Sequence, residues 1–387
     1  MDLAERISRR RVSSTTEDIV ANWEKLDPTI HLDEPVGRGS VLEQILDTLE
    51  TLFNGELPPN LVVRGPAGVG KSAIVISLLS KLADELAESR SRRYTATRGG
   101  KRRDRIRFAY TDARHASSLH KLYHSVLEYL TNEPVPERGI GTDDLRERIE
   151  SELTGTPGAV IAIDHADEGD MIDAATLKRL DEEFGNASLI TIGRSDPQLI
   201  TPGQMAAQIE VPAYRTHELI DLLTVRASHG LTSGITHAQA RTITSWAEGD
   251  AHDALVALFT AAMSASESGH AQLRDADIKI GIDRSPLDGV SLGRVLTLSE
   301  NKQVVLERLF DVPEEQRVSI ETTAETIAAN SALTKTTVRR FLYELADENV
   351  LKKVRAETAP GNNGRRPTRL EPLFPVAVFK QLRSLRQ

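Results

Sequence analysis

The stretch that decides the fold reads Gly65-Pro66-Ala67-Gly68-Val69-Gly70-Lys71-Ser72. An apolar, strand-like run precedes it, and apolar residues at helical spacing follow it: Ile74, Leu78, Leu82 and Leu86. A G-x-x-x-x-G-K-S sequence between a strand and a helix predicts a phosphate-binding loop, because glycines let backbone N–H groups wrap phosphates and the helix N-terminus adds a favourable dipole. In such a loop Lys71 contacts the β- and γ-phosphates of a nucleoside triphosphate and Ser72 ligates Mg²⁺. A glycine-rich turn is the alternative, which the strand and helix on either side disfavour.

The surrounding sequence predicts a parallel sheet with crossover helices, since short apolar runs alternate with helical patterns. The expected strands are Leu61 to Val63, Ile106 to Tyr110, Ala159 to Ile163, Leu189 to Ile192 and Ile209 to Val211. Strand-like runs stop after Pro212, and residues 215–285 show helical patterns alone. We expect an α/β domain over 1–212, a helical domain over 213–285, a linker over 286–298 and a small C-terminal domain over 299–387.

A second nucleotide motif is predicted at the end of the Ala159 to Ile163 strand, where Asp164 follows the apolar run. An acid at this place in a phosphate-loop ATPase holds Mg²⁺ through water. The next residue is usually a Glu that orients the attacking water, but here it is His165, with Asp167 and Glu168 close behind. A neutral imidazole can accept a proton near pH 7, so weak hydrolysis of ATP to ADP and phosphate stays open.

Composition excludes several classes of protein. The 387 residues are 39% apolar, enough for two or three hydrophobic cores. The absence of cysteine excludes disulfides, thiolate zinc sites and cysteine nucleophiles, and ten scattered histidines do not suggest a structural metal site. Since no apolar run approaches 18 residues and the N-terminus has no apolar signal stretch, we expect a cytoplasmic protein without a membrane partner.

The charge is distributed unevenly along the chain. The net charge of −9 alone would disfavour a nucleic-acid partner. However, residues 335–387 hold 12 basic and 5 acidic residues, a net charge of +7, which leaves −16 on the preceding 334 residues. A basic terminal domain on an acidic body is typical of a nucleic-acid-binding module. A second basic run, residues 90–107, is interpreted as a solvated surface loop, with contact to a DNA backbone as the alternative.

The C-terminal region predicts a winged helix-turn-helix, with helices over Lys302 to Phe310, Thr322 to Asn330 and Lys335 to Asp347, followed by a hairpin. In the third helix, apolar residues form one face and leave Lys335, Arg339 and Arg340 available to bind guanine edges and phosphates. The expected wing carries Arg365, Arg366 and Arg369, which suit the minor groove. Protein–protein contact is the alternative role of such a domain.

These motifs together resemble the AAA+ replication-initiator family, the archaeal relatives of the origin recognition complex large subunit and the cell-division-control loader. The resemblance covers nearly the whole chain and includes four more segments: Leu32 to Arg38, Asn60 to Gly65, Val211 to Arg226 and Gly249 to Leu255. It implies an AAA+ phosphate-loop domain with a helical lid and a C-terminal winged helix, and ATP or ADP with Mg²⁺ as cofactors. The nucleotide-binding residues it implies outside the loop are Val36, Gly37, Arg38, Tyr214 and Arg226.

Three positions depart from the family's pattern. His165 replaces the usual Glu, Arg194 stands where the family's first sensor is usually Asn, and His252 replaces the arginine of its second sensor. An arginine is permanently charged, whereas His252 is charged only when protonated. We therefore expect nucleotide binding with slow or absent turnover, with Asp164, His165, Arg194 and His252 as the catalytic positions. Arg179 and Arg194 are the candidates for an arginine that completes a neighbouring subunit's site.

The resemblance predicts an ATP-binding initiator that binds double-stranded DNA at origins, with nucleotide occupancy setting the domain arrangement. Its partners would be a replicative helicase or other initiator subunits. The alternative is an ATP- and DNA-binding regulator that does not act at origins, such as a transcriptional regulator. A third interpretation, an active enzyme that loads a helicase, requires ATP turnover.

Overall fold

The computed structural model describes residues 18–93, 105–114, 116, 118–131, 134–136, 139–168, 173–194, 207–285, 289–313, 316–355 and 368–386. The chain divides into two compact units. One consists of His31–Leu222 and Glu248–Ala251, and the other of the residues up to Ile30, Leu223–Ala247 and the residues from His252 onward.

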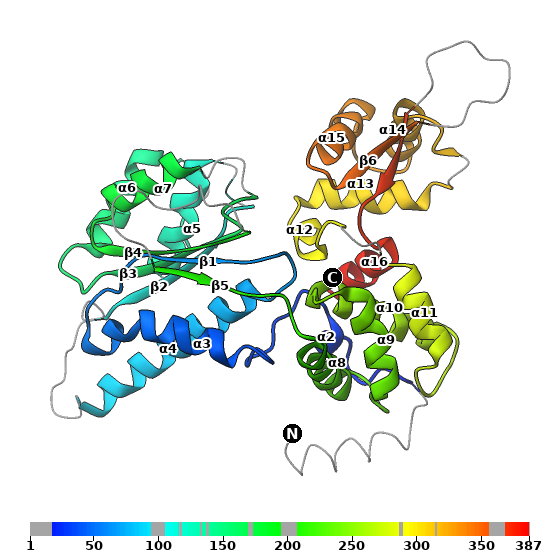
Figure 1. The fold of residues 1–387 in the computed structure, drawn as a ribbon. Helices are drawn as coiled ribbons and strands as arrows, with labels where there is room; N and C mark the ends of the chain where they lie inside the picture. The colour runs from blue at the N-terminus through cyan, green and yellow to red at the C-terminus, as the bar shows by residue number, and fades with distance from the viewer. Residues whose placement is uncertain are drawn as a thin grey trace. The chain divides into compact units, whose positions relative to one another are not determined.

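The first unit is built on a five-stranded parallel sheet, as the sequence predicts (Figure 1). The strands are β1 (Leu61–Arg64), β2 (Arg107–Asp112), β3 (Ala159–Asp164), β4 (Ala187–Gly193) and β5 (Ala207–Glu210). Their order is β2-β3-β4-β1-β5, so β1 lies between β4 and β5. Every residue of β3 is buried, which explains its continuous apolar run. The predicted strands are thus confirmed within a few residues, except that Val211 lies just after β5.

Helices cover both faces of this sheet (Figure 1). On one face lie α3 (Gly39–Thr48) and α4 (Lys71–Arg93), whose Ile45, Ile74 and Leu78 pack with Val160 and Ala162 of β3. On the other face lie α5 (Leu119–Thr131), α6 (Thr142–Leu153) and α7 (Ala174–Glu183), which pack on the alternate β3 residues. The short helix η1 (Glu50–Asn54) connects α3 to the segment before β1. The apolar residues of one strand therefore serve two separate cores.

The second unit contains the predicted helical region. Its helices include α9 (His237–Ala247) and α11 (Asp275–Asp283), while α8 (Thr216–Gly230) and α10 (Ala251–Glu267) contribute residues to both units. The segment from residue 18 to Ile30, with α2 (Trp23–Leu26), groups with these helices, whereas the sequence placed it in the α/β domain. An isolated bridge between Val20 and Leu231 and a ring contact between Trp23 and Phe259 hold it there. The predicted domain boundaries themselves stay a prediction.

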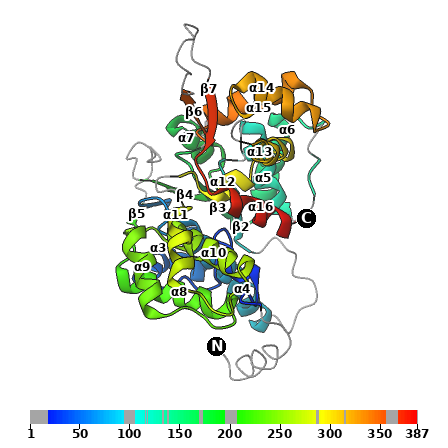
Figure 2. The same ribbon diagram turned by 90° about the vertical axis from the view of Figure 1, so that its right-hand side faces the viewer.

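The C-terminal part has the helix and strand order of a winged helix-turn-helix. It consists of α13 (Glu300–Asp311), α14 (Ile320–Ala329), α15 (Lys335–Asp347), β6 (Leu351–Arg355), β7 (Thr368–Pro372) and α16 (Val376–Leu385). The strands β6 and β7 form an antiparallel hairpin, which lies beside α14 and α15 (Figure 2). The apolar face of α15 is buried as predicted. The sequence did not predict α16, nor α12 (Leu292–Leu296), which lies inside the expected linker.

In the ranges that the structure describes, no helix is long and apolar enough to cross a membrane.

Candidate functional site

The predicted phosphate-binding loop connects the end of β1 to the first residue of α4. Gly68 and Gly70 have φ of +65° and +85°, a region that side chains with a Cβ rarely adopt. At Gly65 a close contact with backbone excludes a side chain as well, and at Gly68 a side chain would displace the Asp250 carboxylate. A Cβ on Gly65 would lie 2.2 Å from the carbonyl oxygen of Val211, and one on Gly68 would lie 1.9 Å from Oδ1 of Asp250. The glycines are therefore required by the backbone path of this loop.

Residues 248–251 belong to the first unit and pack on this loop. The backbone N–H of Ala251 donates to the carbonyl of Gly68 at 3.0 Å, and the N–H of Tyr214 donates to the carbonyl of Gly249 at 3.1 Å. The sequence assigned this segment to the family's second sensor because of Gly249, Asp250 and Ala251. Their contact places the segment directly beside the loop.

Lys71 lies at the loop itself. Its Nζ donates to the carbonyls of Gly65 at 2.9 Å and Pro66 at 2.6 Å. Burial lowers the pKa of Lys71, while the nearby carboxylates of Asp167 and Asp164 act in the opposite direction. The amine is thus held among loop carbonyls and within the field of two acids. Because α4 begins at Lys71, the N–H groups of its first turn have no partner inside the helix, which makes this end suited to an anion.

Arg38 and Tyr214 bring the predicted adenine-side segment against the same loop. The guanidinium of Arg38 lies 3.5 Å from the centre of the Tyr214 ring, and its Nη2 donates to the carbonyl of Val69 at 2.9 Å. A Cβ on Gly70 would lie 3.3 Å from the Tyr214 hydroxyl, and one on Gly37 would lie 3.6 Å from the same ring. Arg38 is only 2% exposed, so it braces the loop from within the fold. Val36 is half-buried beside it.

Asp164 stands at the carboxyl end of β3 and is 1% exposed. One of its oxygens accepts a hydrogen bond from the Tyr110 hydroxyl at the end of β2, and the other accepts from the backbone N–H of His165 at 2.7 Å. Burial, followed by the charge of Asp164, raises the pKa of Tyr110 well above its usual value. The tyrosine therefore stays a proton donor and fixes the orientation of the carboxylate.

His165 has a φ of +54°, which is unusual for a residue with a Cβ and marks local strain beside Asp164. Its Nδ1 lies 3.3 Å from Oδ1 of Asp164 and 3.5 Å from Oδ1 of Asp112. Asp112 also accepts hydrogen bonds from Nε of Arg114 at 2.9 Å and 3.1 Å. Although burial alone would raise it, the nearby His165 ring and the hydrogen bonds from Arg114 hold the pKa of Asp112 below its usual value. His165 thus lies between two carboxylates.

Arg194 follows β4 at the carboxyl edge of the sheet and is bonded to two acids. Its Nη2 donates to Oε1 of Glu168 at 2.8 Å, and its backbone N–H donates to Oδ2 of Asp167 at 2.9 Å. The side chain is 57% exposed. The other arginine-finger candidate, Arg179, pairs with Glu183 on its own helix α7 at 2.7 Å.

Two predicted nucleotide-site residues make other contacts in the second unit. Arg226 is 3% exposed and donates to the carbonyls of Lys25, at 3.2 Å, and Ile30. It therefore ties α8 to the segment from residue 18 to Ile30. The ring of His252 accepts a hydrogen bond from the backbone N–H of Leu292 at 3.4 Å.

The predicted DNA-binding cations lie on α15 and the hairpin. Lys335 pairs with Glu321 at 2.6 Å and with Glu325, and Arg339 pairs with Glu321 at 3.4 Å, both acids belonging to α14. Arg340 lies 3.6 Å from Glu344 of its own helix. On β7, Arg369 pairs with Glu371 at 2.6 Å. Arg365 and Arg366 lie outside the described residues, as does most of the basic run over 90–107.

Sequence reasoning missed five residues of these sites: Tyr110, Asp112, Arg114, Glu321 and Glu325. The first three could have been predicted, because polar residues at the end of a strand beside β3 lie at the same carboxyl edge of the sheet as Asp164. Glu321 and Glu325 could not, since their contacts depend on how α14 packs against α15.

Much of the chain is similar in sequence to known proteins. Residues 34–192 match the family model described as "AAA ATPase domain". An ORC1-type DNA replication protein of Desulfurococcus amylolyticus is 23% identical over 89% of this chain and 86% of its own length. ORC1-type DNA replication protein 1 of Sulfurisphaera tokodaii is 27% identical, over 54% of this chain and only 52% of the relative's length.

Solved structures show the same fold at low sequence identity. The Aeropyrum pernix ORC1 protein, solved in complex with DNA, has a TM-score of 0.62 at 19% identity and covers 96% of this chain and 97% of its own. The Aeropyrum pernix ORC2 protein, in ADPNP and ADP complexes, has a TM-score of 0.56 at 16% identity, with 95% and 99% covered. The chain is thus similar over most of its length to archaeal ORC1-type DNA replication proteins, and its residues 34–192 match an AAA ATPase domain.

Proposed function

We propose that this chain is an origin-type replication initiator that binds ATP or ADP at the Gly65 to Ser72 loop and duplex DNA through its C-terminal domain. The structure of this loop is the main support for nucleotide binding. Its glycines are excluded from bearing side chains, its helix end is suited to an anion, and Lys71 lies at its rim. The Aeropyrum pernix ORC2 relative, solved with ADPNP and ADP, supports this assignment.

The donor set fits Mg²⁺ as well. Ser72 is in the first turn of α4, and Asp164 is a buried carboxylate at the end of β3, oriented by Tyr110. A hydroxyl and a carboxylate are the oxygen ligands that a nucleotide-bound Mg²⁺ takes. These two residues would hold the ion, directly or through water, and the ion would neutralise phosphate charge when bound.

Turnover of the nucleotide is proposed to be weak. His165 stands where ATPases of this type usually have a Glu that orients the attacking water, and its ring nitrogen Nδ1 lies within 3.5 Å of the carboxylates of Asp112 and Asp164. Arg194 is paired with Glu168 and is therefore partly neutralised. His252 stands where the family it resembles has an arginine, and an imidazole does not carry the permanent charge of a guanidinium. A nucleotide that switches the domain arrangement, rather than one that is consumed quickly, agrees with these residues.

The DNA half rests on the charge and architecture of the C-terminal part. Residues 335–387 carry a net charge of +7, and a winged helix-turn-helix presents its third helix and its wing to a duplex. The Aeropyrum pernix ORC1 relative, solved in complex with DNA, has the same fold.

Nucleotide binding is tested by calorimetric titration of ATP and ADP into the purified full chain and into Lys71→Ala. Loss of affinity of at least tenfold in the variant is expected. Lys81→Ala is the matched control, because Lys81 is on the same helix, is 53% exposed and pairs only weakly, with Glu34 at 3.3 Å. Equal affinity of Lys71→Ala and Lys81→Ala would refute the assignment.

DNA binding is tested by fluorescence anisotropy of a labelled duplex over a range of salt concentrations. Removing two cations with Arg366→Ala and Arg369→Ala should weaken binding at all sequences and flatten the slope of log K against log salt by about one to two. Lys121→Ala with Lys178→Ala removes the same charge from exposed positions of the α/β unit. Duplex affinity that is unchanged by the wing substitutions, relative to this control, would contradict the proposal.

A regulator of transcription is the second candidate, and the departures at His165, Arg194 and His252 favour it. These three residues differ from the family's usual residues, while the phosphate-binding loop keeps its full motif. This combination suits a protein that still binds ATP but no longer hydrolyses it. Both candidates bind ATP and duplex DNA, so only the genomic position of the bound DNA separates them.

A further inference from the structure

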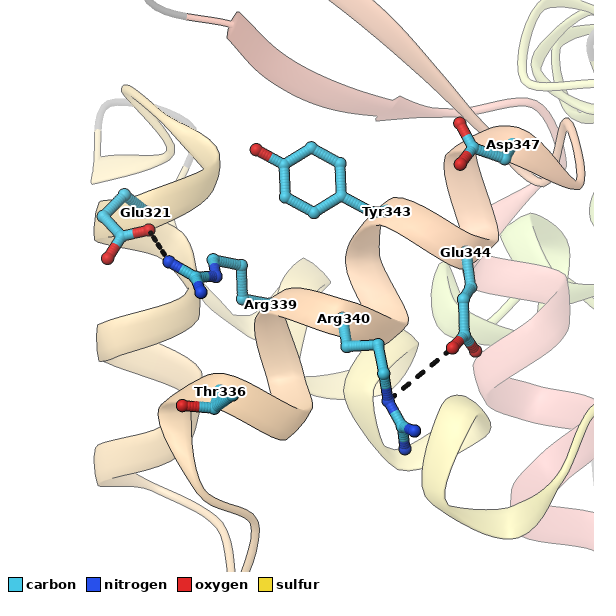
Figure 3. A pocket seen from close by; sticks show the side chains of 7 residues that line it. All are labelled: Glu321, Thr336, Arg339, Arg340, Tyr343, Glu344 and Asp347. Atoms are coloured by element: carbon cyan, nitrogen blue, oxygen red, sulfur yellow. Dashed lines mark hydrogen bonds and ion pairs between the residues drawn. The ribbon is translucent and has the colours of Figure 1, made fainter.

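Each basic residue on the exposed face of α15 has a carboxylate partner. Glu321 of α14 pairs with both Lys335, at 2.6 Å, and Arg339, at 3.4 Å. Glu325, one turn further along α14, is a second partner of Lys335. Arg340 faces Glu344 across 3.6 Å (Figure 3). In a winged-helix domain α15 is the helix that faces DNA. Because its cations are paired with carboxylates, its exposed face is not a basic surface.

A shallow hollow of about 430 Å³ lies on this same face. Figure 3 shows its lining side chains, which are Glu321, Thr336, Arg339, Arg340, Tyr343, Glu344 and Asp347. Two guanidinium groups thus stand among three carboxylates. When Lys335 and Glu325 are included, three cations of α15 face four acids, and Lys353 of β6 pairs with the fourth acid, Asp347, at 2.7 Å, so the charges of this face balance. Tyr343 is 45% exposed between them.

A duplex that approaches this face brings phosphates toward carboxylates as well as toward cations. Exposed ion pairs are individually weak, so a phosphate can displace a carboxylate from Lys335 or Arg339 at little cost in pair energy. The displaced carboxylate nevertheless stays close to the phosphate, because Glu321 and Glu325 are fixed on a neighbouring helix. Non-specific backbone binding by α15 is therefore penalised by like-charge repulsion.

A base edge gives a different balance. An arginine that donates two hydrogen bonds to guanine O6 and N7 gains discrimination that a phosphate contact does not give. Glu321 lies beside Arg339. Its negative charge therefore disfavours a contact of Arg339 with a charged phosphate more than a contact of Arg339 with an uncharged guanine edge.

We propose that Glu321, with Glu325, determines specificity in this domain by holding Lys335 and Arg339 away from backbone phosphates, so that α15 contributes affinity only at a matching sequence. This inference rests on the proposed duplex binding and adds the residues that suppress its non-specific part. It also implies that cations outside α15 supply the salt-dependent, non-specific part of the affinity for duplex DNA.

The protonation states agree with this role. A hydrogen bond from Lys335 is the largest influence that lowers the pKa of Glu321, and the bond to Glu321 raises the pKa of Lys335. Both groups therefore stay charged at the neutral pH where duplex binding is measured.

The test uses the full chain carrying Glu321→Gln and Glu325→Gln, with Asp311→Asn as the matched control. Asp311 is 46% exposed, against 50% for Glu321, and also pairs with two cations, Lys380 and Arg308, but it is on α13 and not in the hollow. Anisotropy of a random-sequence duplex is measured between 50 and 200 mM salt. We expect the double variant to bind about tenfold more tightly than the control and to have a salt slope steeper by about one to two.

A duplex selected from a random pool by the unaltered chain provides the second readout. Its affinity relative to random duplex should fall in the double variant, because only the non-specific term improves. Random-duplex affinity and salt slope equal to those of Asp311→Asn would overturn the inference. If the unaltered chain binds no duplex at 50 mM salt, the proposed function itself fails, which is a different result. Glu325→Gln alone, which leaves Glu321 in place, serves if the double variant does not fold.

Discussion

The guanidinium of Arg38 lies 3.5 Å from the centre of the Tyr214 ring while it donates to the carbonyl of Val69. One buried cation thus joins three segments: the turn before α3, the phosphate-binding loop and the turn before α8. A cation over an aromatic face contributes about 2 kcal/mol when it is shielded from water. Arg38 therefore stabilises the phosphate-binding loop through the fold, by its hydrogen bond to Val69.

The first prediction concerns this support. Arg38→Lys keeps the charge but loses the planar group that stacks on Tyr214, so it should weaken ATP affinity by about tenfold and lower the free energy of unfolding by about 1–2 kcal/mol. Calorimetric titration and urea unfolding measure the two effects. Unaltered ATP affinity in a folded Arg38→Lys chain would show that the loop does not depend on this contact.

The second prediction concerns Gly68 and Asp250. Gly68→Ala forces a Cβ into the left-handed region and against the carboxylate of Asp250, so it should weaken ATP binding more than tenfold. Adding Asp250→Ala to this variant should recover part of the loss, because it removes the clash but not the backbone strain. A double variant whose loss equals the sum of the two single losses would mean that the two residues do not interact.

The third prediction concerns Asp112 and pH. Because its partners hold the pKa of Asp112 below the ordinary value of 3.8, ionised Asp112 stabilises the fold fully above that value, and this contribution is lost as the pH falls through the lower folded-state pKa. Asp112→Asn should lower the free energy of unfolding at pH 7 by on the order of 3 kcal/mol, since it leaves Arg114 without its charged partner. The difference from the unaltered chain should shrink by about 1.4 kcal/mol for each pH unit below the ordinary pKa. Urea unfolding at pH 7 and pH 3 checks this, and a difference that grows toward pH 3 would be inconsistent with it.

The fourth prediction separates two roles of Arg226. Its hydrogen bonds go to the carbonyls of Lys25 and Ile30, so its removal should destabilise the helical part of the chain. Arg226→Ala should cost about 3 kcal/mol of unfolding free energy, as expected for a buried, hydrogen-bonded charge. At a temperature where the variant is folded, its ATP affinity should change less than threefold. A tenfold loss of ATP affinity without destabilisation would instead support the nucleotide contact that the family resemblance implies.

Much of the fold was predictable because its signals are local. The glycine loop between a strand and a helix, and the apolar runs of β1 and β3, predict the parallel sheet from short segments. An apolar face was predicted for the third helix of the C-terminal domain, and Val338, Phe341, Leu342 and Leu345 form that buried face in α15. In contrast, α12 and α16 were missed, because α12 has only five residues and α16 follows the hairpin, the last element that the winged-helix pattern predicted.

The site was predictable where a single segment carries it, and not where packing assembles it. Lys71, Ser72 and Asp164 each belong to a motif that can be recognised from neighbouring residues. Tyr110 reaches Asp164 across 54 positions of sequence, and only the pairing of β2 with β3 brings the two together. The roles of Arg38 and Arg226 as buried supports likewise depend on which carbonyl groups the fold places in their reach.

The genomic position of the DNA that this chain binds in replicating cells decides whether it is an origin-binding initiator. The chain is cross-linked and immunoprecipitated with its DNA, the fragments are sequenced, and Lys71→Ala serves as the comparison. We expect enrichment of repeated sites beside a replication origin, with weaker enrichment in Lys71→Ala. Enrichment confined to promoters away from origins would contradict the proposed initiator function and identify a regulator instead.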